Sequence, residues 1–351
     1  MNELRLMEAS SINRCVTGFT ADVFGKLIQQ IFLNPWRVLP LVLVAYCTAK
    51  GKQTTQRYPR TFQWLQILAS LAILRRTNSW ANRRALDNGT SDCYDWTREV
   101  VVLTGGSNGI GKQIAILLGN RGIKVAVLDI QPPQDELPPT VRYCKCDITY
   151  PAEVSEVAAN IRATMGEPTV LINNAGLCSS RTILSGTEAQ TRLQFEVNTL
   201  SHYWLSREYL PSMIQRNHGM VVTVASQAGY VTTPNMVDYS ATKAAAISFH
   251  EGLGAELVSR YNAPRVRTVL VTQGFTQTAL ISELTPEDTW FNPLLLPETV
   301  AEAIVKQVLT GSSGHVLVPG STGWLAKIFR GFPLWYQHKL RVRLERLMRA
   351  S

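Results

Sequence analysis

The sequence lacks the residue groupings that bind metal ions. It holds six cysteines and five histidines in 351 residues, and both kinds are scattered along the chain. No pair of cysteines has zinc-ligand spacing to a second pair or to nearby histidines. Cys144 and Cys146 alternate along a predicted strand, and we interpret them as inert thiols. No metal site is therefore predicted, and the main domain is interpreted as belonging in a reducing compartment.

The amino end lacks a cleavable signal sequence. Glu3, Arg5 and Glu8 come early, and no short apolar region with a small-residue cleavage site follows. The chain also lacks a comfortable membrane span, because its apolar runs at 38–49 and 62–74 hold about a dozen residues each, whereas a spanning helix takes roughly 20.

The residues around these runs indicate attachment to a membrane surface. An amphipathic stretch at 23–36 precedes them, a polar and basic turn from Lys50 to Arg60 separates them, and Arg75 and Arg76 follow. We predict that residues 1–95 form an apolar helical anchor, either a hairpin or an interfacial segment, with the rest of the chain on the cytosolic face of the endoplasmic reticulum or of lipid droplets. A small helical subdomain that packs on the main domain is the alternative.

The net charge of +9 suits either nucleic acid or an anionic membrane surface. The last segment, 321–351, interleaves aromatic and aliphatic residues with lysine and arginine from Trp324 to Met348. This pattern is typical of a basic amphipathic helix on a membrane, and a charged helix packed on the core is the alternative. Because no recognition motif accompanies the charge, we predict a membrane surface as a partner and no nucleic acid.

Between residues 96 and 320, short apolar runs alternate with helical stretches. The predicted strands are 99–103, 124–128, 141–146, 169–172, 220–225, 265–271 and 315–318. Continuous apolar runs of this length are typical of parallel strands buried on both faces. Repeated strand–helix–strand units predict an α/β fold with a doubly wound parallel sheet of about seven strands.

A glycine-rich turn follows the first strand and opens the first helix of this region, predicted from Lys112 to Asn120. Such a turn directs backbone N–H groups and the positive end of a helix at phosphates. The predicted cofactor-binding residues of this turn are Gly105, Ser107, Asn108, Gly109, Ile110 and Gly111.

Asp129 ends the second strand, where a carboxylate accepts hydrogen bonds from the adenosine ribose hydroxyls. It would also repel a 2′-phosphate, and no basic residue stands at Asn108 or Ile130 to attract one. NAD is therefore predicted as the preferred cofactor, with NADP as the alternative.

Further cofactor contacts are predicted at the ends of later strands. Asp147 and Ile148 follow the third strand, where a carboxylate can reach the adenine edge. Asn174 and Gly176 follow the fourth strand, where small residues let a cofactor lie close and asparagine can brace the backbone.

Tyr239 and Lys243 stand four residues apart in a proline-free, alanine-rich stretch that predicts a helix over 237–257. Phenol and ammonium then share one helix face. A cation beside the phenol would lower its pKa and make Tyr239 a proton acceptor near neutral pH. Ser226 ends the fifth strand, where open α/β sheets bind ligands. Taken alone, a tyrosine and a lysine at this spacing are also an ordinary helical pair.

Together, these motifs resemble the short-chain dehydrogenase/reductase family over residues 99–319, and within it the membrane-associated retinol and hydroxysteroid dehydrogenase group. The closest stretches are 197–204, 217–226 and 237–251. The resemblance implies a Rossmann-type fold with Tyr239 as general acid/base and Lys243 holding the nicotinamide ribose. It further implies that Ser226 binds the reacting oxygen and that Asn198 orders a water linked to Lys243. Thr276 and Thr278 are implied as further cofactor contacts, and the resemblance leaves room for a homodimer.

One position departs from the family pattern. Gln273-Gly274 stands where the family has Pro-Gly, which puts the seat of the nicotinamide ring in question. Beyond Thr278, apolar residues at 279–281 and 290–296 predict a lid over a lipophilic pocket, or else an ordinary packed loop.

The predicted function is hydride transfer between a nicotinamide cofactor and a lipophilic alcohol or carbonyl, such as a retinoid, a steroid or a long-chain lipid. The alternatives are a non-catalytic NAD-binding protein of a membrane or lipid-droplet surface, and a soluble carbonyl reductase of secondary metabolism.

Overall fold

A computed structural model describes residues 21–278 and 293–345. At its centre lies a seven-stranded sheet, all parallel, in the order β3-β2-β1-β4-β5-β6-β7. The strands are β1 (Val100–Thr104), β2 (Lys124–Asp129), β3 (Val141–Lys145), β4 (Val170–Asn173), β5 (Gly219–Val224), β6 (Val266–Gln273) and β7 (Gly314–Val318). The predicted doubly wound parallel sheet is confirmed.

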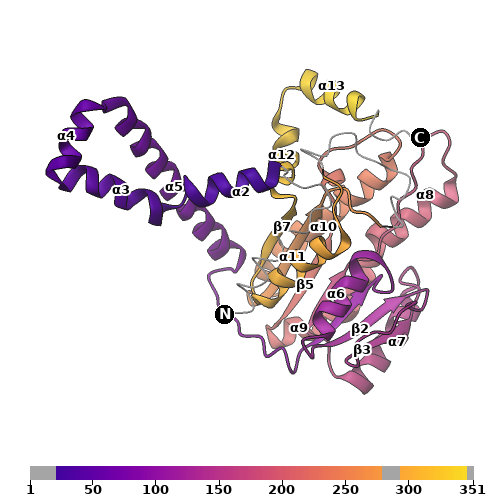
Figure 1. Ribbon diagram of the computed structural model, residues 1–351. Helices are drawn as coiled ribbons and strands as arrows, with labels where there is room; N and C mark the ends of the chain where they lie inside the picture. The colour runs from indigo at the N-terminus through magenta and orange to yellow at the C-terminus, as the bar shows by residue number, and fades with distance from the viewer. Residues whose placement is uncertain (1–20, 279–292, 346–351) are drawn as a thin grey trace.

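Helices cover both faces of this sheet (Figure 1). One core cluster joins the sheet to α6 (Gly109–Gly119) and α11 (Pro297–Leu309). A second joins the opposite face to α7 (Pro151–Met165), α9 (Ser201–Arg216) and α10 (Val237–Ser259). Because both faces are covered, β1, β4 and β5 are buried at every residue, which explains their continuous apolar sequence.

Within the described residues from 21 onward, four helices precede the sheet domain: α2 (Ala21–Ile31), α3 (Pro35–Cys47), α4 (Ala49–Arg57) and α5 (Pro59–Leu86). Helices α3, α4 and α5 form a hairpin that projects away from the sheet (Figure 1). Its two arms touch through Tyr46, whose ring meets Phe62 edge-on at 5.1 Å and whose hydroxyl accepts a 2.8 Å hydrogen bond from Gln66. Apolar side chains such as Trp36, Leu41 and Trp64 lie exposed along it.

Two expectations for this region need correction. The basic stretch from Lys50 onward is helix α4 rather than a turn, because the Thr48 side chain caps it by accepting from the Gly51 N–H at 3.0 Å. The segment Val23–Cys47, with 25 residues, is also long and apolar enough to cross a membrane by length and composition. The predicted apolar run at 38–49 was shorter because it did not include α2. Glu3, Arg5 and Glu8 lie outside the described residues.

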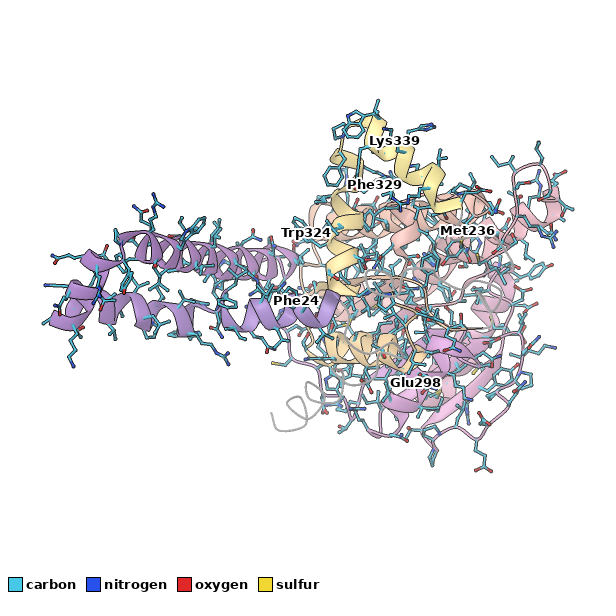
Figure 2. All side chains as sticks on the ribbon, turned by 45° about the horizontal axis from the view of Figure 1, so that its top comes forward. Phe24, Met236, Glu298, Trp324, Phe329 and Lys339 are labelled. Carbon is cyan, nitrogen blue, oxygen red and sulfur yellow. The ribbon has the colours of Figure 1, made fainter. Side chains whose placement is uncertain are left out.

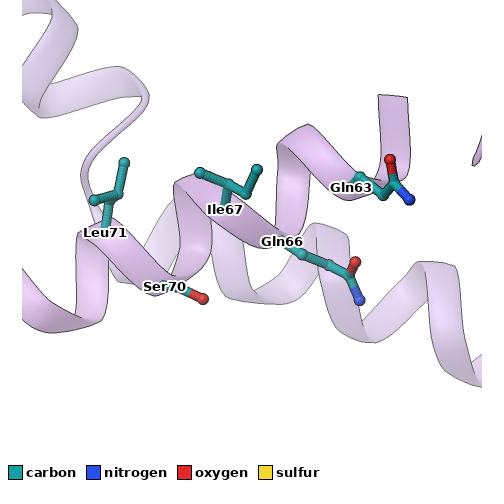
Figure 3. A pocket seen from close by; sticks show the side chains of 5 residues that line it. All are labelled: Gln63, Gln66, Ile67, Ser70 and Leu71. Carbon is teal, nitrogen blue, oxygen red and sulfur yellow. The ribbon is translucent and has the colours of Figure 1, made fainter. Parts of the chain in front are cut away.

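An open hollow lies on the hairpin, on one side of α5 (Figure 3). It is lined by Gln63, Gln66, Ile67, Ser70 and Leu71. Amide, hydroxyl and aliphatic groups are neither acids, bases nor activated nucleophiles, so this hollow is not the reaction centre.

The carboxyl-terminal segment folds as two helices rather than as one amphipathic helix. Helix α12 (Gly320–Ile328) leads through a 3₁₀ turn (Phe329–Gly331) to α13 (Leu334–Leu344), and Pro333 stands at the break. Helix α12 packs on β7 and contacts α2. Figure 2 labels Phe24 on α2 and Trp324 on α12 where the hairpin meets the sheet domain. The residues from Arg346 onward lie outside the described range.

A docking segment, residues 87–96, connects the hairpin to β1 along the amino-terminal edge of the sheet. Arg267 of β6 is 1% exposed and donates to the carbonyl oxygens of Asp87 at 2.8 Å and Thr90 at 3.0 Å. The Tyr94 hydroxyl donates to the Gly219 carbonyl at 2.6 Å. The docking segment is therefore bound to β5 and β6 at the edge opposite to the carboxyl ends of the strands.

Candidate functional site

The glycine-rich turn after β1 is built as a close backbone crossing. Gly105 has φ of +66°, and its N–H donates to the Leu128 carbonyl of β2 at 2.9 Å. A side chain on Gly111 would collide with the Gly105 carbonyl and the Asn174 amide. Only glycine at both places allows the turn to cross the strand ends this closely.

Helix α6 begins inside this turn, at Gly109, three residues before the predicted start at Lys112. Asn108 occupies the cap position but makes no side-chain capping bond. Within the described residues, no side chain caps the first N–H groups of the helix, which belong to Gly109, Ile110 and Gly111. Such N–H groups suit an anion.

The Asp129 carboxylate is bound to the same turn. One oxygen accepts from the Ser107 N–H at 3.0 Å and the other from the Gln131 N–H at 3.2 Å. The Ser107 hydroxyl donates to the Gln131 carbonyl at 2.6 Å. Asp129 is thus held half-buried beside the turn, with Ile130 exposed next to it.

Asp147 and Asn174 both serve as local braces. The Asp147 carboxylate accepts from the N–H and hydroxyl of Thr149 at 3.0 and 2.7 Å. The Asn174 amide donates to the carbonyls of Thr104 and Gly105 at 3.0 and 3.1 Å, which ties the end of β4 to the glycine-rich turn. The Ile148 side chain packs in the core, so only its backbone can meet a ligand.

Asn198 lies in a π-helical turn, Glu196–Leu200, between α8 (Glu188–Phe195) and α9. Both N–H groups of its side-chain amide are used, since the nitrogen donates to the Leu177 carbonyl at 2.8 Å and to the Thr242 hydroxyl at 3.0 Å. The amide oxygen accepts from the Leu177 N–H at 2.7 Å. A water bound by Asn198 could therefore use only the remaining lone pair of the side-chain oxygen or the backbone carbonyl.

Ser226, Tyr239 and Lys243 meet at the carboxyl end of β5. All three are buried, with exposed fractions of 7%, 7% and 3%. Ser226 lies close enough to the Tyr239 hydroxyl to lower the pKa of Tyr239. The Lys243 ammonium donates to the Val224 carbonyl at 3.0 Å and lies 5.7 Å from the centre of the Tyr239 ring.

Electrostatics correct one expectation about this group. Burial raises the pKa of Tyr239 above its ordinary value and the Cys178 thiol adds to the rise, whereas the neighbouring Ser226 side chain lowers it. Burial also lowers the pKa of Lys243 to about 8. The predicted lowering of the Tyr239 pKa is therefore wrong for this arrangement, because desolvation of the phenolate prevails and the ammonium is directed at Val224.

The family model of short chain dehydrogenases matches residues 99–289, from the start of β1 to beyond β6. The chain is a short-chain dehydrogenase. It is 47% identical over 201 residues to dehydrogenase RED2 of Cochliobolus heterostrophus, covering 56% of this chain and 76% of that protein. It is 31% identical over 245 residues to estradiol 17-beta-dehydrogenase 11 of Rattus norvegicus, covering 67% of this chain and 80% of that protein.

Among solved structures, aldohexose dehydrogenase of Thermoplasma acidophilum matches with a TM-score of 0.55, 24% identity and coverage of 64% of this chain and 93% of that one. This likeness shows the shared fold. The family match and the dehydrogenase relatives confirm an oxidoreductase that acts on CH–OH groups, and membership of this family implies NAD or NADP as the cofactor.

The residues present fit a nicotinamide dinucleotide. A Cβ atom at Gly176 would lie 3.5 Å from both the Lys243 ammonium and the Asn198 amide oxygen, so glycine here leaves the ammonium open to a ligand. The uncapped start of α6 and the Asp129 carboxylate complete a row along the strand ends. The Lys243 ammonium suits the nicotinamide ribose, the start of α6 suits the pyrophosphate, and the Asp129 carboxylate suits the adenosine ribose.

The structure also brings in residues that the sequence did not single out. Thr242 links the Asn198 amide to the backbone of Tyr239, and Cys178 lies against Tyr239. Each depends on contacts between distant segments, so no local pattern signals it. Of the predicted lid, residues 279–292 lie outside the described range, whereas Leu295 is fully packed in the core.

Proposed function

We propose that this short-chain dehydrogenase oxidises a hydroxyl group of a lipophilic molecule, or reduces the matching carbonyl, with NAD and with Tyr239 as the general acid/base. The observation that carries the proposal is the buried meeting of Ser226, Tyr239 and Lys243 beside the open face at Gly176.

In this mechanism, Ser226 and Tyr239 bind the substrate hydroxyl. In reduction, Ser226 holds the carbonyl oxygen and the Tyr239 hydroxyl, which burial keeps protonated, donates its proton to that oxygen. In oxidation, the phenolate form of Tyr239, stabilised by the Lys243 ammonium, takes the proton back from the substrate hydroxyl. The bound nicotinamide supplies the hydride acceptor for the carbinol carbon. Lys243 stays an ammonium at neutral pH, since its pKa is about 8. With one N–H on Val224, two remain for the ribose hydroxyls and for stabilising the phenolate.

NAD is proposed over NADP because Asp129 is fixed where the adenosine ribose would lie. Its two oxygens are held by the backbone at Ser107 and Gln131, so the carboxylate cannot swing away from a 2′-phosphate. Its neighbour Ile130 is exposed and uncharged.

A lipophilic substrate is supported by the side chains around the phenol. Tyr239 packs with Met236, Cys178, Ala228 and Phe275. The loop that bridges to Met236 through Arg181 carries the exposed apolar residues Ile183 and Leu184. A relative named estradiol 17-beta-dehydrogenase 11 agrees with a large apolar substrate.

We also propose that residues 1–95 anchor the protein on the cytosolic face of the endoplasmic reticulum or of lipid droplets, that 96–320 form the catalytic domain, and that 321–351 rest on the same membrane surface. The exposed apolar residues of α2 and α3 support the anchor. Exposed Trp324, Leu334 and Trp335 lie near basic residues of α12 and α13, which supports the surface contact.

The test is Tyr239→Phe in the detergent-solubilised full chain, assayed with NAD on a panel of retinoid, steroid and long-chain alcohols by absorbance of the reduced cofactor. Loss of the proton acceptor is expected to reduce kcat at least about 100-fold with NAD binding retained. Tyr209→Phe is the matched control, because it removes another buried phenol hydroxyl far from Ser226 and should leave kcat unchanged. Turnover that survives Tyr239→Phe would refute the mechanism.

A further inference from the structure

Gln273 ends β6 with its side chain enclosed and its amide oxygen unbonded. It is 8% exposed, and its Oε1 atom has no hydrogen-bond partner within residues 21–278 and 293–345. An unpaired buried amide disfavours the folded state, so a group of this kind points to a ligand that it meets.

The neighbouring strand shows where this amide lies. Val224 of β5 is opposite Val271 of β6, and continuing the register by two residues sets Ser226 beside Gln273. The Ser226 hydroxyl donates to the Gln273 carbonyl at 3.4 Å. Because side chains alternate along a strand, the Ser226 and Gln273 side chains leave the sheet on the same face. The Gln273 side chain, with its unbonded amide oxygen, is thus adjacent to the Ser226 hydroxyl.

The chain after Gln273 runs from the Ser226 hydroxyl to the glycine-rich turn. The Thr276 hydroxyl donates to the Gly274 carbonyl at 3.2 Å, and a Cβ atom on Gly109 would lie 3.3 Å from the Thr278 methyl. Thr278 therefore lies at the start of α6, the phosphate end of the site, and Gln273 lies at the opposite end, where the nicotinamide ring would sit.

We propose that the Gln273 side chain binds the carboxamide of the nicotinamide ring, an inference that rests on the proposed function. Two carboxamides are complementary, because each offers a carbonyl acceptor and an NH₂ donor. Proline at this position would present no such group. The side-chain amide of Gln227 also lies nearby, but its Nε2 atom already donates a hydrogen bond to the Val318 carbonyl at 3.2 Å.

The test compares two ligands that differ in the nicotinamide ring alone, NAD and ADP-ribose, on the solubilised full chain. Gln273→Met keeps the shape of the side chain without its hydrogen bonds. It is expected to weaken NAD binding about tenfold, to leave ADP-ribose binding within about twofold and to leave the melting temperature equal or higher. Equal weakening of both ligands, or unchanged NAD binding, would overturn the proposal.

Gln307→Leu is the matched control. Its amide donates to the Ser312 carbonyl at 2.9 Å near the amino-terminal edge of β7, so its loss should lower the melting temperature and leave both ligands bound as before. A wild-type chain that binds neither ligand would instead overturn the proposed function.

Gln273→Glu provides a second readout that does not depend on the methionine variant folding. A carboxylate beside the ring favours the positively charged oxidised form, so the ratio of NAD to NADH affinity is expected to rise several-fold. An unchanged ratio would contradict the proposed contact.

Discussion

Burial of Lys243 disfavours the positive charge that its proposed role in the site requires. Desolvation lowers its pKa from 10.5 to about 8, so the folded state pays to keep it charged at neutral pH. The unfolded chain binds this proton more readily between pH 8 and 10.5, and stability therefore rises with pH across that window.

Replacing the amine should reveal this conflict. Lys243→Met is expected to raise the free energy of unfolding at pH 7 by up to about 3 kcal/mol, because each pKa unit corresponds to about 1.4 kcal/mol. The advantage should shrink as pH rises from 8 towards 10.5, and activity should be lost. Thermal unfolding of both proteins across pH 7 to 10 measures it, and a less stable variant at pH 7 would show that the bond to Val224 outweighs desolvation.

We predict that the choice between NAD and NADP depends on Asp129 and on the position that follows it. Asp129→Asn with Ile130→Arg keeps an acceptor for the backbone of the glycine-rich turn while replacing repulsion of a 2′-phosphate by attraction. The ratio of NAD to NADP affinity is expected to fall roughly 10- to 100-fold, as for the loss of a charge-assisted hydrogen bond. Michaelis constants for both cofactors check it; a wild-type preference for NADP would contradict the assignment.

At the scale of elements, the start of α6 leaves little room for side chains. A methyl group on Gly111 meets backbone and the Asn174 amide, so Gly111→Ala is expected to lose about 1–3 kcal/mol of stability and to abolish NAD binding.

Gly252→Ala is its control on α10. It has open space around the new methyl group, so it should stabilise that helix by about 0.5–1 kcal/mol and leave NAD binding intact. Chemical denaturation and cofactor titration of both variants provide the measurement. Intact NAD binding in Gly111→Ala would show that the turn can shift.

The sheet was predictable because its central strands, β1, β4 and β5, are buried on both faces and are therefore continuous apolar runs in the sequence. Helical spacing predicted that Tyr239 and Lys243 share one face, and the end of a parallel strand placed Ser226 at the ligand-binding edge. Their grouping into one site was predicted from the resemblance to the short-chain dehydrogenase family. Helix α4 was missed because its sequence is polar on every side and its start depends on one capping threonine, Thr48.

The charge states of the site could not be predicted in the same way. The pKa of Tyr239 depends on how much water the folded chain removes, and the direction of the Lys243 ammonium depends on a carbonyl of β5. Both are properties of packing between segments that lie far apart in sequence.

At the scale of the whole molecule, the exposed apolar hairpin and the α12–α13 segment predict membrane attachment by two separate parts. The full chain is expected to sediment with membranes and to resist high salt, because apolar burial is insensitive to screening. A chain beginning at Asp87 lacks α2–α5 but keeps its docking segment. It should be released in part, with the remainder bound through basic residues and removed by salt. Fractionation with salt and detergent washes tests this, and a full chain that stays soluble without detergent would remove the anchor.

The docking segment gives the boundary between anchor and enzyme an unexpected position. The family match begins at residue 99, yet Arg267 inside the sheet donates its hydrogen bonds to the carbonyl oxygens of Asp87 and Thr90. Cleavage between those residues and β1 would leave the buried guanidinium, among the described residues, with only its 3.4 Å contact to the Pro264 carbonyl. The loss would be up to about 3–5 kcal/mol against a total stability of roughly 5–15 kcal/mol. A protease that cuts there would therefore release a catalytic domain that unfolds more readily than the intact chain.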